Sequence, residues 1–331
     1  MLPNRYQIFR SKNFYSERRE KQLKKSNKAL KLIAIGLAAS ALITLQPSAS
    51  QGLTPSPKQA TVYKKLLWKQ EFTGKAGTKP NSKIFNYDMG GGGWGNNEHQ
   101  AYTNHNAVLS GTGQLNINLN RITPDLEDLY EQCPIDTPGN ACEFESSRLQ
   151  TKNKISFKYG RLEARIRVPV GDGTWPAFWL LGTDISTNAW PNCGEIDIME
   201  TKGSEPYTVH GTAHGPGYSG GDGIVDTKTL GTKIGAGYHV YALDWTYNKM
   251  QWSVDGKVYH TVTPSIVGNH TYVFNKQMFM IMNVAAGGWF AGDIDPDLNS
   301  ARMSIDYIRY YSLNGVGKVY GTSSAIAAGK P

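Results

Sequence analysis

The chain has 331 residues, 39% of them hydrophobic, which is enough for one large globular domain or two small ones. Its formal net charge is +8, from 35 Lys and Arg against 27 Asp and Glu. The first 31 positions hold ten of the basic residues and two acidic ones, so they account for the whole surplus. The rest of the chain is neutral overall, so the basic pI does not indicate nucleic-acid binding and no nucleic-acid partner is expected.

The first 50 residues have the features of an export signal. Basic residues from Arg5 to Lys31 overlap the start of the apolar run ALKLIAIGLAASALITL (29–45), and the small residues of QPSAS follow it. We interpret residues 1–50 as a secretory signal peptide, with an uncleaved single-span anchor as the alternative. The protein is therefore expected to be secreted and extracellular, with membrane contact only through an uncleaved leader. Pro, Ser and Gly in residues 51–60 predict a solvated linker.

From residue 61 to residue 312 the hydrophobic pattern has a period of two, which is typical of half-buried strands. Leu115, Ile117 and Leu119 alternate with asparagines, and segment 160–170 alternates in the same way. Further expected features are a hairpin at 250–262 with an Asp255-Gly256 turn, strands near 238–245, 278–284 and 303–311, and a possible helix near 124–132. Many short strands favour an antiparallel β-sandwich. The small residues of 313–331 predict a flexible C-terminal tail.

Only three cysteines occur, which is too few for a zinc site at these spacings. Cys133 and Cys142 flank the loop sequence CPIDTPGNAC and could form a disulfide in an exported protein. Cys193 would then be the odd thiol. We interpret it as a small buried apolar residue, because no histidine stands near it in a nucleophile motif.

The segment GEIDIMETKG (194–203) places Glu195, Asp197 and Glu200 within six residues of an expected strand. Alternate residues of a strand share one face, so the first two acids project together while the isoleucines between and after them face the core. Strict alternation would turn Glu200 away from the other acids. A one-residue bulge at Met199 corrects the parity, and bulges recur beside active sites. The sequence therefore predicts three acids on one face.

Crowded like charges repel and destabilise a strand, so the cluster needs a functional reason. Repulsion raises the proton affinity of one carboxyl and keeps an acid available near neutral pH. With the bulge, Glu195 and Glu200 lie about 6–7 Å apart along the backbone at roughly 3.3 Å per residue. Side-chain tilt can then reach the ~5–5.5 Å between carboxyls of a retaining glycosidase, in which one acid attacks and the other donates a proton. A calcium site on a loop and an idle acidic edge are the alternatives.

With its neighbouring segments, the acid motif resembles glycoside hydrolase family 16 over most of residues 61–312. The E-x-D-x-x-E spacing is similar to the laminarinase branch and its agarase and carrageenase relatives. The matching segments are GWGNNEHQAYT (93–103), SSRLQTKNKISFKYGRLEARI (146–166), TWPAFWLLG (174–182), AWPNCGEIDIME (189–200), VHGTAHGPGYSGG (209–221) and SIDYIRYY (304–311). The resemblance implies an all-β, antiparallel β-jelly-roll sandwich of concanavalin-like type with a concave substrate cleft. It also implies retaining hydrolysis of internal β-1,3-glucosidic bonds.

Carried over residue by residue, the resemblance implies that Glu195 is the nucleophile, Asp197 its hydrogen-bonded assistant and Glu200 the general acid/base. No cofactor is expected for this chemistry. The resemblance also implies a structural calcium ion on the outer face of the sandwich. Asp306 in SIDYIRYY matches one ligand position of that site, and Glu71 in EFTGKAG is a weaker match.

The same resemblance implies a set of substrate-binding residues. Trp175 and Trp190 match aromatic positions whose flat faces cover the apolar face of a pyranose. Asn97 belongs to the W-G-N-N-E segment near the minus subsites. His210 and His214 have equal strand parity, so one of them is expected to be structural. The glycine-rich loop after His214 favours His214 as the substrate-binding residue.

Two further tryptophans are interpreted differently. Trp179 is expected to belong to the core. Trp289, in AAGGWFAGD, departs from the Asn-Trp-Pro-Gly pattern of the family, so no subsite is assigned to it.

Three functions stay open at this point. The leading interpretation is a monomeric secreted endo-β-1,3-glucanase whose partner is a polysaccharide. The second is a retaining hydrolase of the same fold that acts on a mixed-linked glucan or a galactan, since loops set the subsites. The third is a lectin that binds glucan without cleaving it, which the intact Glu195 and Glu200 disfavour.

Overall fold

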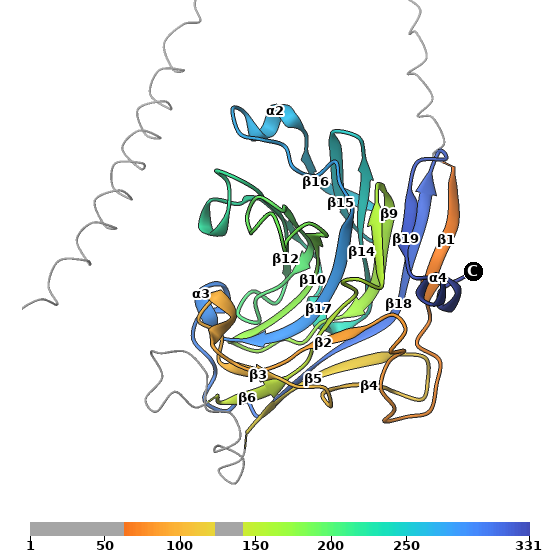
Figure 1. Cartoon of the computed structure of the whole chain (residues 1–331). Coiled ribbons are helices and arrows are strands. Elements are labelled where there is room, and N and C mark those ends of the chain that lie inside the picture. The colour runs from red at the N-terminus through yellow and green to blue at the C-terminus, as the bar shows by residue number, and fades with distance from the viewer. Residues whose placement is uncertain (1–62, 123–141) are drawn as a thin grey trace, which may run out of the picture. The chain divides into compact units, whose positions relative to one another are not determined.

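The computed structural model describes residues 63–122 and 142–331, which form one β-sandwich (Figure 1). Within these residues one sheet has ten strands, in the order β16-β15-β14-β9-β18-β5-β6-β3, with β1 beside β18 and β4 beside β5. Its strands are β1 (Lys64–Gln70), β3 (Gln100–Tyr102), β4 (Ala107–Leu109), β5 (Leu115–Arg121), β6 (Phe144–Ser146), β9 (Gly160–Arg167), β14 (His239–Thr246), β15 (Lys249–Val254), β16 (Lys257–Val262) and β18 (Ser300–Leu313).

The second sheet has nine strands in the described residues, in the order β13-β12-β11-β10-β17-β7-β2, with β8 beside β17 and β19 beside β8. Its strands are β2 (Asn86–Asp88), β7 (Arg148–Gln150), β8 (Ile155–Lys158), β10 (Thr174–Gly182), β11 (Glu195–Glu200), β12 (Thr208–His214), β13 (Ile224–Thr229), β17 (Met278–Ala286) and β19 (Lys318–Gly321). Short helices complete the set: α2 (Pro264–Val267), α3 (Gly288–Ala291), α4 (Ser323–Ala328), η1 (Gly93–Gly95), η3 (Gly220–Asp222) and η4 (Ile234–Ala236). No described helix is long and apolar enough to span a membrane.

The predicted strands are confirmed, and their alternation explains the layering. In β5 the leucines and isoleucine are buried and the asparagines half-buried, as a strand with one wet face requires. The hairpin of β15 and β16 turns at Asp255 and Gly256, whose φ values of 49° and 76° are both positive, as the predicted two-residue primed turn requires. Among the strands of residues 63–122 and 142–331, all pairs are antiparallel except β3 with β6. The predicted helix near 124–132 and Cys133 lie outside the described residues.

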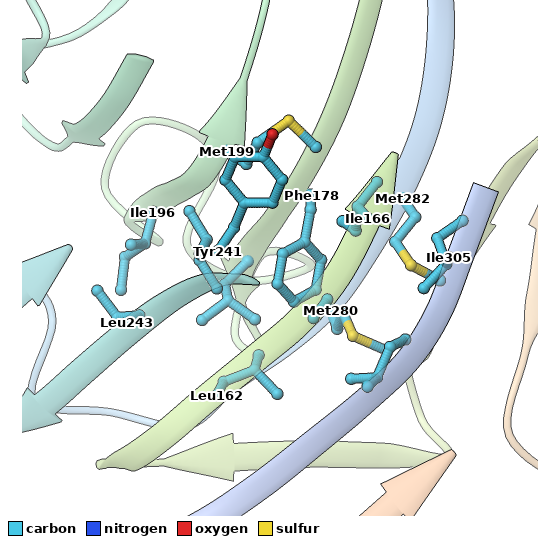
Figure 2. Close-up of a cluster of buried hydrophobic side chains, with 14 of the residues drawn as sticks. Leu162, Ile166, Phe178, Ile196, Met199, Tyr241, Leu243, Met280, Met282 and Ile305 are labelled. Atoms are coloured by element: carbon cyan, nitrogen blue, oxygen red, sulfur yellow. The ribbon is translucent and has the colours of Figure 1, made fainter. Parts of the chain in front are cut away.

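The core lies between the two sheets and is drawn in Figure 2. Strands β9, β14 and β18 contribute from one sheet, and β10, β11 and β17 from the other; the labelled residues are Leu162, Ile166, Phe178, Ile196, Met199, Tyr241, Leu243, Met280, Met282 and Ile305. Burying such side chains stabilises the fold by about 1.5–3 kcal/mol each. The strand that carries the acids is thus anchored by its apolar face.

The C-terminal residues differ from the prediction of a flexible tail over 313–331. Strand β19 pairs with β8, and α4 is capped by Thr322, whose Oγ1 accepts a hydrogen bond from the Ala325 backbone N–H at 3.2 Å. Gly329 packs against Trp68 so closely that an added Cβ would lie 1.9 Å from Nε1 of the indole. The small residues that predicted flexibility are therefore the ones that close packing on Trp68 requires.

Candidate active site

The predicted bulge in β11 is confirmed, and it spans Ile198 and Met199. Against β10, Met199 pairs with Phe178 and Asp197 pairs with Trp179, so Ile198 is the extra residue. Against β12, three steps from Asp197 to Glu200 face only two steps on the partner strand. The two bulge residues are both buried in the core, and the parity of Glu200 is shifted as predicted.

Two side chains contact strand β11 at the acids, one from the ten-stranded sheet and one from the neighbouring strand β12. The Trp252 indole Nε1 donates a hydrogen bond to the backbone oxygen of Asp197 at 2.8 Å. His214 pairs with Glu195 across the β11–β12 ladder, and its Nε2 lies 3.2 Å from Asp197 Oδ2 and 3.7 Å from Glu195 Oε1. The structure thus places His214, which was predicted as a substrate-binding residue, beside the acids.

His210, the other histidine of β12, faces a different group. Its Nε2 lies 2.9 Å from Glu205 Oε2, and its ring meets the edge of Phe290 with centroids 5.2 Å apart. The assignment of His210 as structural and His214 as the site residue agrees with this geometry.

Glu200 is held by an indole. Trp175 Nε1 donates a hydrogen bond to Glu200 Oε1 at 2.8 Å, and the Trp175 ring packs on Phe290 of α3 at 4.9 Å between centroids. This contact fixes one carboxyl oxygen of Glu200 and leaves the other oxygen for chemistry. Trp175 therefore positions an acid in addition to lining the cleft.

Burial raises the pKa of all three carboxyls, because a carboxylate loses hydration there. For Glu195 and Glu200, repulsion from Asp197 raises the pKa further, and the pKa of each of the three carboxyls reaches about 8. The nearby His214 opposes the rise at both glutamates. The site therefore holds protons near neutral pH. Burial is the largest cause, and the repulsion that the sequence predicted adds to it at Glu195 and Glu200.

This raised pKa implies a stability cost that a substitution can measure. An unfolded Glu titrates near its ordinary pKa of about 4.3, so the native state binds more protons than the unfolded state between there and pH 8. Stability from this group is therefore lost as pH rises through that interval. We expect Glu200→Gln to increase the free energy of unfolding by roughly 1–3 kcal/mol at pH 8 and by little at pH 4. Urea denaturation at both pH values checks this, and an equal change at both would contradict it.

The acids lie in a cleft of about 350 Å³. Four tryptophans and several polar side chains line it; the lining residues are Trp94, Gly95, Asn96, Glu98, Arg148, Trp175, Ala177, Trp179, Leu181, Ile185, Trp190, Glu195, Asp197, Glu200 and Asn283. Trp190 is 44% exposed, which leaves an indole face available to a ligand. The predicted Trp175 and Trp190 are thus both cleft residues.

The structure places Asn96, the neighbour of the predicted Asn97, in the lining of the cleft. Asn96 lines the cleft and donates from Nδ2 to Glu98 Oε1 at 2.9 Å, whereas Asn97 is not among the lining residues. Asn97 instead occupies a left-handed conformation with a φ of 58°, as does Trp94 with a φ of 50°. Such conformations turn the chain sharply, and here they carry the loop over the cleft.

Several cleft residues were not predicted as site residues. Trp179 was expected in the core, but its ring lines the cleft and its Nε1 donates to Asn283 Oδ1 at 2.8 Å. The Arg148 guanidinium lies 4.8 Å from the Trp179 ring and 4.9 Å from the Trp94 ring. The even spacing of Trp175 and Trp179 on β10 was the available signal, because it places both on one face. Trp289, to which no subsite was assigned, is 78% exposed and does not line the cleft.

The two predicted calcium ligands are paired with arginines. Glu71 receives two hydrogen bonds from Arg309, at 2.9 and 3.1 Å, and Asp306 receives one from Arg165 at 2.6 Å. Calcium binding by these carboxylates would have to displace both arginines. As arranged, the pair does not fit a calcium site. Among the described residues, the acidic and histidine side chains that cluster in threes are Glu195, Asp197 and His214.

Buried carboxylates in a cleft lined with indole rings are the arrangement with which glycoside hydrolases bind and cleave sugars. The family is shown by a family model described as "Glycosyl hydrolases family 16", which matches residues 95–309. The chain belongs to this family. The match includes the bulged acid strand and all of the cleft-lining residues except Trp94, and it confirms the resemblance found in the sequence.

Known relatives agree with this assignment. Glucan endo-1,3-beta-glucosidase A1 of Niallia circulans is 35% identical over 74% of this chain, which spans 37% of that longer protein. A beta-glucanase of Rhodothermus marinus is 36% identical over 74% of this chain and 84% of its own length. The laminarinase catalytic domain of Thermotoga petrophila is a solved structure with a TM-score of 0.69 and 36% identity, covering 77% of this chain and 100% of that one. The all-β sandwich and the hydrolase class follow from these matches.

Proposed function

We propose that the protein is an endo-acting hydrolase of β-1,3-glucans that works by a retaining double displacement. The bulged strand β11 carries the proposal, because it presents Glu195, Asp197 and Glu200 to one cleft. The names of the relatives, glucan endo-1,3-beta-glucosidase and laminarinase, support the linkage and the endo mode. This two-carboxylate chemistry needs no cofactor.

The reaction divides between the two glutamates. Glu195 attacks the anomeric carbon while Glu200 gives its proton to the departing glycosidic oxygen, which leaves a covalent glycosyl-enzyme and a shortened glucan. Glu200 then takes a proton from water, whose oxygen replaces Glu195 at the anomeric carbon. Asp197 and His214 contact each other beside Glu195, where they can adjust its charge and hold its orientation.

The pH dependence of activity follows from the proton on Glu200. Burial raises the pKa of Glu200 to about 8, and the general acid is active only while protonated. We expect kcat/KM on laminarin to fall about tenfold per pH unit above pH 8 as Glu200 loses its proton. The pKa of Glu195 is raised equally, so the fall on the acid side reports the coupled carboxyls together and not Glu195 alone. An activated aryl glycoside, which needs no protonated leaving group, should lose this alkaline limb. A rate that stays constant to pH 10 on laminarin would contradict the assignment.

The choice among glycans is tested by product analysis of the purified domain on laminarin, lichenan and agarose in parallel. We expect laminarin to give a ladder of short oligosaccharides whose first products keep the β configuration in proton NMR. Release of single sugars alone, or an inverted first product, would contradict the endo or the retaining assignment. Relatives named endo-1,3-1,4-beta-glycanase and keratan-sulfate endo-1,4-beta-galactosidase make lichenan and agarose the informative comparisons.

A binding protein without activity is the competing class, and one relative is named beta-1,3-glucan-binding protein. The acids here are all present, raised in pKa and held by specific partners such as Trp175. A lectin has no need for that arrangement. Any turnover of laminarin that Glu195→Gln removes excludes the binding-only function.

We infer that the protein is exported and acts outside the cell as a monomer. The basic leader, its apolar run and the small residues before position 51 support export. The N-terminal sequence of the protein recovered from culture medium checks this, with a mature terminus expected near residue 50. Recovery of the intact chain in the membrane fraction would favour the anchor instead. Size-exclusion chromatography with light scattering checks the monomer.

A further inference from the structure

A chain of hydrogen bonds leads from the cleft floor to a buried carboxylate. Trp179 Nε1 donates to Asn283 Oδ1 at 2.8 Å, and Asn283 Nδ2 donates to the Tyr102 hydroxyl at 3.0 Å. That hydroxyl donates in turn to Glu98 Oε2, also at 3.0 Å. All three bonds have the same direction, toward Glu98. Hydrogen bonds aligned in this way polarise and strengthen one another in a buried site.

Glu98 is the fixed end of this chain. It is 3% exposed, and besides Tyr102 it accepts hydrogen bonds from Asn96 Nδ2 at 2.9 Å and Gln100 Nε2 at 2.6 Å. The other end of the Gln100 amide accepts from the backbone N–H of Ala286, which fixes its orientation. Burial raises the pKa of Glu98, and the three donated hydrogen bonds oppose that rise. As a carboxylate, Glu98 offers only acceptors, so every neighbour donates to it. Glu98 therefore sets the direction of each bond up to Trp179.

Trp179 lies next to the acids. It is the cross-strand partner of Asp197, and directly opposed residues of two strands project from the same face. Its indole also faces the Arg148 guanidinium, which an ion pair with Asp88 holds at 3.0 Å. The Trp179 ring is thus held by two contacts: the Arg148 guanidinium packs on its face, and Asn283 accepts a hydrogen bond from its N–H. A sugar beside the acids would rest on a ring whose tilt these contacts determine.

We propose that Glu98 and Tyr102 are positioning residues that hold the Trp179 indole and the Asn283 amide in the orientation needed to bind a sugar beside the acids. They act through Asn283 and do not themselves form the sugar platform. Without the Tyr102 hydroxyl, Asn283 Nδ2 loses its acceptor and the amide is free to rotate, which leaves Trp179 Nε1 without a fixed partner. The inference rests on the proposed function only for the identity of the sugar.

The test is Tyr102→Phe, which keeps the ring and removes the central hydroxyl. The matched control is Tyr241→Phe, because Tyr241 is equally buried but its hydroxyl has no hydrogen-bond partner among the described residues. We expect Tyr102→Phe to raise KM about five- to tenfold with kcat within twofold of wild type, since an aromatic platform binds the ground state and transition state alike. Tyr241→Phe should leave both constants unchanged. An unchanged KM in Tyr102→Phe overturns the proposal.

A double-mutant cycle separates positioning from a general structural role. Trp179→Phe keeps an aromatic face but removes the N–H that the chain orients. If Tyr102 acts through Trp179, adding Tyr102→Phe to Trp179→Phe should change KM by less than twofold. Full additivity overturns the proposal. Glu98→Gln replaces one acceptor oxygen by a donor and should raise KM by a similar factor. It is the substitute test if Tyr102→Phe does not fold.

These outcomes are independent of the identity of the substrate. The kinetic constants are measured on whichever polysaccharide the wild-type protein cleaves in the parallel assay of laminarin, lichenan and agarose. Cleavage of a glycan other than laminarin would overturn the proposed linkage and leave this test in force. Additive effects on laminarin would overturn the positioning role and leave the proposed function in force.

Discussion

Glu195→Gln is expected to reduce kcat on laminarin by about 10⁴-fold or more, the scale on which loss of a nucleophile acts. The amide is the same size as the carboxylate but cannot form the covalent glycosyl-enzyme. Binding should survive, because the cleft aromatics remain in place and the substitution removes a buried charge. Initial-rate kinetics and calorimetric titration with a laminari-oligosaccharide measure the two effects separately.

The control for this variant is Glu71→Gln, which changes another glutamate to its amide. Glu71 directly follows strand β1 of the ten-stranded sheet and accepts a hydrogen bond from Arg309. It is not among the residues that line the cleft. It should keep wild-type kcat. Turnover of Glu195→Gln within tenfold of wild type would remove Glu195 from the nucleophile role.

Glu200→Ala is expected to lower kcat on laminarin by about 10²–10⁴-fold, the usual contribution of general acid–base catalysis. The loss should be much smaller for the first step on aryl glucosides with good leaving groups, because a phenolate departs without a proton. Burst kinetics on a dinitrophenyl glycoside measure that step. The substitution also leaves Trp175 Nε1 without its acceptor, so KM should rise slightly.

A matched comparison separates the two glutamates. Glu195→Ala should stay inactive on the activated substrate, whereas Glu200→Ala should recover the glycosylation step and gain further from added azide, which needs no general base. Equal inactivity of both variants on the dinitrophenyl glycoside would contradict the division of roles.

Sequence alone was sufficient for the strand pattern and for the acids, because both depend on local parity. The alternation in β5 and the charge spacing in β11 each fix which side chains share a face. The bulge could be inferred since a third acid would otherwise project into the core. Its extra residue, Ile198, could not be identified, because the register of β10 against β11 decides it.

The rest of the site depends on contacts between distant segments. Asn283 is a single polar residue in the apolar run MFMIMNVAA, and its purpose is visible only once Trp179 and Tyr102 are seen beside it. The conformation of the loop that contains Trp94 could not be predicted either. Glycines allow many backbone conformations, so the sequence does not show which residues adopt a positive φ. Trp179 was assigned to the core because a tryptophan on a strand of a sandwich usually lies there. The sequence pattern of a strand whose side chains line a cleft does not differ from that of a strand whose side chains face the core.

The covering of Trp68 by the last residues has a consequence for biosynthesis. Trp68 Nε1 donates to the Ala325 oxygen across 257 positions, and the Lys69 N–H donates to Gly329. Strand β1 therefore emerges from the ribosome long before the segment that covers Trp68, so this part of the nascent domain stays open until residues 325–329 have been made. For the export proposed above, such a delay would keep the polypeptide from becoming compact before it crosses a translocation channel.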